Sequence, residues 1–93
     1  MMEILRSRSD VRRVVLFGSL AEGRVRRASD VDLVVVVDTD RRFLDRLDDL
    51  YRALCPRVAL DLLALTPAEF QRLATESPWL RRALARGRVL HAA

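Results

Sequence analysis

Lysine and asparagine are absent from this chain of 93 residues, and cysteine, glycine and aromatic residues are scarce. All 17 basic residues are therefore arginines, a bias that we attribute to a GC-rich genome. The single cysteine, Cys55, cannot form an internal disulfide, and its place at the end of an apolar helical pattern predicts a small core side chain. Aromatic residues make up only 5% of the chain, which disfavours a nucleic-acid surface built from stacking rings.

Long hydrophobic runs are also missing. The longest, residues 33–37, is far shorter than the roughly 20 apolar residues that a membrane-spanning helix needs. The N-terminus lacks the apolar region of a signal peptide, so we expect a soluble, cytoplasmic protein without membrane contact. A content of 51% hydrophobic and 32% charged residues predicts a folded chain, and its length suits one core. We therefore expect a single domain over residues 1–93.

The net charge is +4, but the arginines are scattered in short doublets and do not form a stripe. A solvated surface explains most of them, and helix-turn-helix spacing is absent. Direct nucleic-acid binding is therefore not expected, although a small nucleic-acid-binding protein remains an alternative because arginine suits phosphate recognition.

Apolar patterns predict alternating strands and helices. Continuous β-branched runs predict strands, the second of them central and covered on both faces, and a 3, 4, 7 spacing predicts an amphipathic helix. The expected fold is α/β (α+β), a small mixed central sheet with helices packed against it. The expected strands are 14–17, 32–37 and 58–65 with an edge strand at 88–91, and the amphipathic helix is 41–55.

Two further helices have recognisable start signals. Thr66 and Glu69 form a capping box, and Ser77 before a proline repeats the signal. In the second of these helices Trp79 is expected in the buried stripe, and Gly87 is expected to supply a left-handed C-terminal stop.

The acidic residues Asp30, Asp32 and Asp61 are the first candidates for chemistry. Asp30 and Asp32 are two apart at the start of a strand, so their carboxylates share a face and repel each other. Magnesium, an arginine or water could relieve that repulsion. Asp61 stands alone in an apolar strand, where a buried carboxylate would need a partner. Taken singly, the aspartates have structural explanations: Asp30 could be a turn and helix-cap residue, Asp32 the partner of an arginine and Asp61 an exposed residue of an edge strand.

A Gly-Ser pair directly after the first strand strengthens the case for a nucleotide site. Gly18 permits a tight turn and a close backbone approach, and the N-terminus of a following helix would offer N–H groups to a phosphate. Gly18-Ser19 alone is a weak signal, and its specificity comes from the aspartates that follow.

The combination of Gly18-Ser19, Gly23, the segment 29–33 and Asp61 resembles the DNA polymerase beta-like nucleotidyltransferase superfamily, in particular its minimal nucleotidyltransferase branch. The resemblance covers nearly the whole chain. It implies that Asp30, Asp32 and Asp61 are catalytic metal ligands and that Gly18 and Ser19 contact a triphosphate. One departure is Leu20, which stands where such proteins often have arginine; Arg24 is a candidate substitute.

The resemblance also implies a reaction and a partner. Two Mg²⁺ ions would assist transfer of a nucleoside monophosphate, AMP from ATP, to a hydroxyl, with Asp61 receiving its proton. The acceptor would be a HEPN-domain toxin that the chain counteracts as an antitoxin, either by transferring AMP to a tyrosine or by direct binding. A non-catalytic module that neutralises a partner by contact alone remains the alternative to an enzyme.

Overall fold

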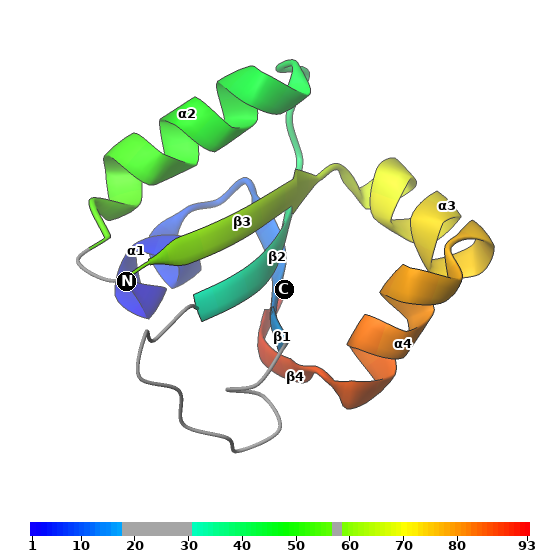
Figure 1. The fold of residues 1–93 in the computed structure, drawn as a ribbon. Helices are drawn as coiled ribbons and strands as arrows, with labels where there is room; N and C mark the ends of the chain where they lie inside the picture. Colours follow the sequence, from blue (N-terminus) through cyan, green and yellow to red (C-terminus); the bar gives the residue numbers. More distant parts are fainter. Residues whose placement is uncertain (18–30, 57–58) are drawn as a thin grey trace.

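The structure, a computed structural model, describes residues 1–17, 31–56 and 59–93. Four strands in these ranges form one mixed sheet in the order β3-β2-β1-β4, with helices on both faces (Figure 1). The predicted α+β fold class is therefore confirmed. The elements are α1 (Met2–Ser7), β1 (Val11–Phe17), β2 (Val31–Val37), α2 (Phe43–Leu54), β3 (Leu60–Leu65), α3 (Pro67–Glu76), α4 (Pro78–Arg86) and β4 (Arg88–Ala92).

Strand β2 organises the sheet, because it runs antiparallel to β1 and parallel to β3. The chain between the two parallel strands contains α2, which provides the crossover that a parallel pair requires. Strand β4 pairs antiparallel with the other side of β1. The interior position of β2 explains why residues 33–37 are all buried, and it confirms the expectation of a central strand covered on both faces.

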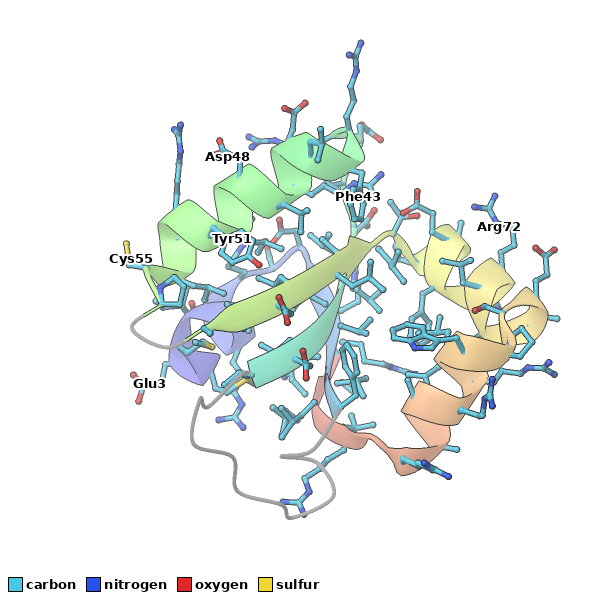
Figure 2. All side chains as sticks on the ribbon, in the orientation of Figure 1. Glu3, Phe43, Asp48, Tyr51, Cys55 and Arg72 are labelled. Carbon is cyan, nitrogen blue, oxygen red and sulfur yellow. The ribbon has the colours of Figure 1, made fainter. Side chains whose placement is uncertain are left out.

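One face of the sheet packs against α1 and α2. Leu5 of α1 and Leu50 of α2 are almost completely buried against alternate residues of β2, among them Val35. The side chain of Tyr51 points from α2 toward the sheet (Figure 2), and its hydroxyl donates a 2.6 Å hydrogen bond to the carbonyl of Leu60. Helix α1 was not predicted from the sequence, because six residues are too few to show a helical period.

The opposite face packs against α3 and α4, which lie together on the other side of the sheet from α2 (Figure 1). Its buried cluster joins Val15, Val34 and Leu65 of three adjacent strands to Leu80 of α4. The cluster occupies the middle of this face. No helix in the described ranges is long and apolar enough to cross a bilayer.

Both predicted helix starts are confirmed. The Thr66 hydroxyl accepts a 3.2 Å hydrogen bond from the Glu69 backbone N–H, and the Glu69 carboxylate accepts a 2.9 Å bond from the Thr66 N–H. Together these bonds form the capping box expected at the start of α3. The Ser77 hydroxyl accepts a 3.2 Å bond from the N–H of Leu80 and so caps α4.

Two predictions about helix ends are wrong. Gly87 has φ −78° and ψ 171°, so it does not supply a left-handed stop. Glycine is needed there for space, since a Cβ atom would lie 2.9 Å from the carbonyl oxygen of Ala83 and 2.9 Å from Cγ1 of Val15. The left-handed residue is Cys55, with φ 42° and ψ 60°, at the C-cap of α2. Because it lies beyond the last helical turn, Cys55 is exposed and is not a core side chain.

The first strand is longer than expected, because it continues through two charged residues. Arg12 and Arg13 of β1 are exposed, and the Arg13 guanidinium lies 5.5 Å from the centroid of the Phe70 ring. The apolar pattern alone therefore predicted too short a strand for β1. The expected start of the third strand, Val58, lies outside the described residues, and the described strand begins at Leu60.

A buried arginine that the sequence analysis missed connects α2 to α3. Arg46 is 9% exposed, and its guanidinium donates to the carboxylate of Glu69 at 2.6 Å. It also donates to the carbonyls of Arg41 at 2.7 Å and Ala64 at 3.3 Å. The hydrogen bond from Arg46, followed by the one from the Thr66 backbone, lowers the pKa of Glu69 below its ordinary value.

Candidate active site

Two of the three aspartates singled out in the sequence lie side by side in the sheet. The register of the parallel strands pairs Asp32 of β2 with Asp61 of β3. Adjacent strands are about 4.8 Å apart, and residues paired in this way direct their side chains to the same face. The fold thus brings together two carboxylates that are far apart in the chain.

This pair lies at the end of the sheet where β2 and β3 begin. Asp32 shares its face with Val34 two residues later, and Asp61 shares it with Leu65, both of which are buried beneath the α3–α4 layer. The aspartates themselves are less covered, since Asp32 is half-buried and Asp61 is exposed. The pair therefore lies beside the apolar cluster, on a part of the face that solvent and a ligand can reach.

The expectation of a buried Asp61 is wrong. Strand β3 is an edge strand of the sheet, and Asp61 is near its start, so water reaches the carboxylate. Desolvation therefore does not require a partner for Asp61. The reason to expect a cation is instead the pairing with Asp32. Like charges at directly opposed positions of neighbouring strands repel each other, and a bound cation would relieve that repulsion.

The other predicted site residues lie outside the described part of the chain. They are Gly18, Ser19, Arg24 and Asp30, together with the departure at Leu20. Within residues 1–17, 31–56 and 59–93, no group of three or more histidine, cysteine, aspartate or glutamate side chains could hold a metal ion. The described residues supply two carboxylates of the expected three.

An aromatic pair lies next to the aspartates and was not expected there. Phe17, the last residue of β1, is the register partner of Asp32. Its ring meets the Trp79 ring at a centroid distance of 5.9 Å and an interplanar angle of 89°. Trp79 was predicted to be part of the buried stripe of its helix, but its side chain is 56% exposed, so that prediction is wrong. The helical period placed Leu80 correctly in the core and could not show that Trp79 lies at the margin of the sheet.

A second cluster of charges lies at the opposite end of the sheet, where β2 ends at Val37. Arg8 donates 2.8 Å hydrogen bonds to Asp10 and to Asp49, and Arg41 lies 3.8 Å from Asp49. The hydrogen bond from Arg8 lowers the pKa of Asp10, and the two carboxylates raise the pKa of Arg8. These charges compensate one another, so we interpret the cluster as a connection between the α1–β1 turn and α2 and not as a reactive site.

The chain is similar to a known protein family in sequence and to solved structures in fold. The model of the nucleotidyltransferase domain family matches residues 1–86. No curated protein sequence matches the chain. A candidate nucleotidyltransferase from Sulfolobus solfataricus has a similar structure, with a TM-score of 0.66 and 22% identity over 98% of this chain and 72% of that chain.

Two toxin–antitoxin structures are also similar. One, which contains AMP-PNP, has a TM-score of 0.58 and 22% identity over 99% of this chain and 70% of that chain. The other, a variant of the pair MntA-HpeT, has a TM-score of 0.55 and 21% identity over 99% of this chain and 69% of that chain. At such identities the likeness establishes a shared fold.

The sequence match includes the strands that position Asp32 and Asp61, and the fold agrees with it. The chain therefore belongs to the nucleotidyltransferase domain family.

Proposed function

We propose that this chain is a magnesium-dependent nucleotidyltransferase that moves AMP from ATP to a hydroxyl group of a partner protein. The observation that carries the proposal is the register of β2 and β3, which places Asp32 beside Asp61 on the accessible end of one sheet face. A nucleoside triphosphate brings several negative charges of its own. Two neighbouring carboxylates would repel it unless divalent cations were bound between them.

The described residues fit magnesium in ligand type and in access. Asp32 and Asp61 offer hard carboxylate oxygens, and neither is sealed beneath the α3–α4 layer. Asp30 is the proposed third ligand. Bound magnesium, in two ions, would neutralise the charge on the pyrophosphate that leaves as AMP is transferred, and would lower the pKa of the acceptor hydroxyl. The Asp61 carboxylate, which is exposed on an edge strand, is the proposed acceptor of the proton from that hydroxyl.

Triphosphate binding is assigned in this proposal to the segment between β1 and β2. Gly18 and Ser19 are the proposed phosphate contacts. Arg24 is the proposed cationic contact, because Leu20 stands where similar proteins often have an arginine. These roles rest on the sequence resemblance. Phosphoryl-type transfer depends mainly on positioning and charge stabilisation, so one domain over residues 1–93 would be sufficient.

The proposed partner is a HEPN-domain toxin, and the proposed biological role is that of an antitoxin in the cytoplasm. Support comes from similarity of fold to proteins described as toxin–antitoxin systems, one of them crystallised with AMP-PNP. Transfer of AMP to a toxin hydroxyl would add a charged, bulky group and so block its function.

Incubation of the chain with labelled ATP, Mg²⁺ and the product of the neighbouring gene tests this proposal. We expect the label to appear on the partner with the wild-type chain and to fall at least a hundredfold with Asp61→Asn, as is typical when a metal ligand and proton acceptor is lost. Asp48→Asn is a matched control, because Asp48 lies on the outer side of α2, away from the sheet (Figure 2). Neutralisation of the partner without transfer of label would contradict catalysis and support the alternative of a non-catalytic binding module.

A further inference from the structure

Trp79 is a large aromatic side chain that the fold leaves half outside its core. It is the only tryptophan in the sequence and is 56% exposed. Among the described residues, the cluster beneath α4 is completed by Leu80, the next residue, which is 1% exposed. Isolated exposed hydrophobic residues are common, so the exposure of Trp79 is informative only in combination with its surroundings.

The contact with Phe17 does not cover both faces of the indole. The two ring planes are at 89°, so the edge of one ring meets the face of the other. If the indole edge meets Phe17, both indole faces are clear of that ring. If the Phe17 edge meets the indole, one indole face remains clear of it. In either arrangement Phe17 holds Trp79 in place and does not cover it completely.

The register places this aromatic pair beside the carboxylates. Phe17 is the partner of Asp32, and Asp32 is the partner of Asp61, so the three residues form one row across the end of the sheet. Trp79 of α4 contacts the Phe17 ring at one end of this row. In a nucleotide the base is joined to the phosphates through the sugar, so a base-binding group must lie to one side of the metal-binding carboxylates and not between them.

We propose that Trp79 stacks on the nucleobase of a nucleoside triphosphate held at Asp32 and Asp61; this inference rests on the proposed function. Aromatic side chains bind bases through their π faces and tolerate any base. Arg82, three residues after Trp79 on the same helix, is exposed and adds a positive charge on a neighbouring position that favours an anionic ligand. Trp79 would be a nucleotide-binding residue, and the reaction itself would remain with the aspartates.

The fluorescence of Trp79 provides a direct test, since no other tryptophan contributes. ATP and tripolyphosphate, which lacks a base, are titrated in Mg²⁺ with excitation outside the adenine band. We expect quenching by ATP and little change with tripolyphosphate. In calorimetry, Trp79→Ala should weaken ATP binding about tenfold and leave tripolyphosphate binding unchanged. Trp79→Phe should retain part of the affinity, and Leu44→Ala, an exposed residue of α2, is the matched control.

The results would distinguish failure of base stacking at Trp79 from failure of the proposed nucleotide site. If ATP binds Trp79→Ala as tightly as wild type, or if only the affinity for the protein acceptor falls, stacking on the base is overturned while the nucleotidyltransferase assignment stands. If the wild-type chain binds neither ATP nor tripolyphosphate in Mg²⁺, the proposed nucleotide site is wrong, and the role of Trp79 is overturned with it.

Discussion

Arg46 lies on the inner side of an amphipathic helix, where a charged side chain is costly to bury unless its nitrogens are hydrogen-bonded. The structure meets this requirement, because all three guanidinium nitrogens donate, to the carbonyls of Arg41 and Ala64 and to the carboxylate of Glu69. Glu69 also accepts from the backbone N–H of Thr66, the N-cap of α3. A single residue of α2 thus fixes the start of α3, and with it the layer that borders the aspartates.

We expect Arg46→Met to lower the free energy of unfolding by about 2–3 kcal/mol, because it leaves the buried carbonyl of Ala64 and the carboxylate of Glu69 without this donor. Urea denaturation measures this change. Arg52→Met, on the exposed face of the same helix, removes a surface pair with Asp48 and should change stability by less than about 0.5 kcal/mol. Equal effects of the two variants would show that the Arg46 bonds contribute little to stability.

The residues show where sequence reasoning reaches its limit. Asp32 and Asp61 could be selected because charged residues interrupt apolar strands, and their pairing followed once β3 was placed beside β2. Trp79 and Arg46 could not be assigned, because a helical period gives the direction of a side chain and not where the neighbouring layer ends. Exposure at the margin of a sheet is a property of the assembled layers.

Elements were easier to predict than their ends. Helix α2, strand β2 and the two caps at Thr66 and Ser77 agree with their sequence patterns, because each follows from local chemistry. The end of α4 does not agree with its sequence pattern. Gly87 was expected to adopt a left-handed conformation, but it is extended and lies against the neighbouring strand, a requirement set by tertiary packing.

Gly87→Ala tests how α4 docks on the sheet. Its φ of −78° suits alanine, so a loss would come from close contacts of the new Cβ atom, at 2.9 Å with Ala83 and Val15 and at 3.0 Å with the carbonyl oxygen of Leu16. The Ala83 atom is a backbone oxygen that cannot move independently of the helix. We expect a loss of about 1–3 kcal/mol, measured by thermal and urea unfolding.

Ala85→Ser, on the exposed side of α4, is the control for that experiment and should cost about 0.5 kcal/mol or less. A stable Gly87→Ala protein, with an unfolding midpoint equal to that of the control, would contradict close packing of this turn on β1.

For the molecule as a whole, two ion pairs make the free energy of unfolding depend on pH. Arg8 lowers the pKa of Asp10, and Arg46 lowers the pKa of Glu69. Because the folded-state pKa values lie below the unfolded ones, this stabilisation is complete above about pH 5 and decreases as the pH falls below about 4. Urea midpoints measured from about pH 7 to about pH 3 should show this loss.

Arg46→Met should flatten part of this acid dependence, because Glu69 would regain a pKa nearer its ordinary value. An identical loss of stability with acid in the variant and the wild-type chain would contradict the assignment of Glu69 as one of the responsible groups.

In the proposed site, Asp32 and Asp61 together bind a metal–nucleotide complex. Calorimetric titration with AMP-PNP, in the presence and absence of Mg²⁺, tests this binding without an acceptor protein. We predict binding by the wild-type chain that depends on Mg²⁺ and is at least tenfold weaker in Asp61→Asn, whose unfolding midpoint stays near that of wild type. Equal, Mg²⁺-independent binding of AMP-PNP by the wild-type chain and by Asp61→Asn would contradict it.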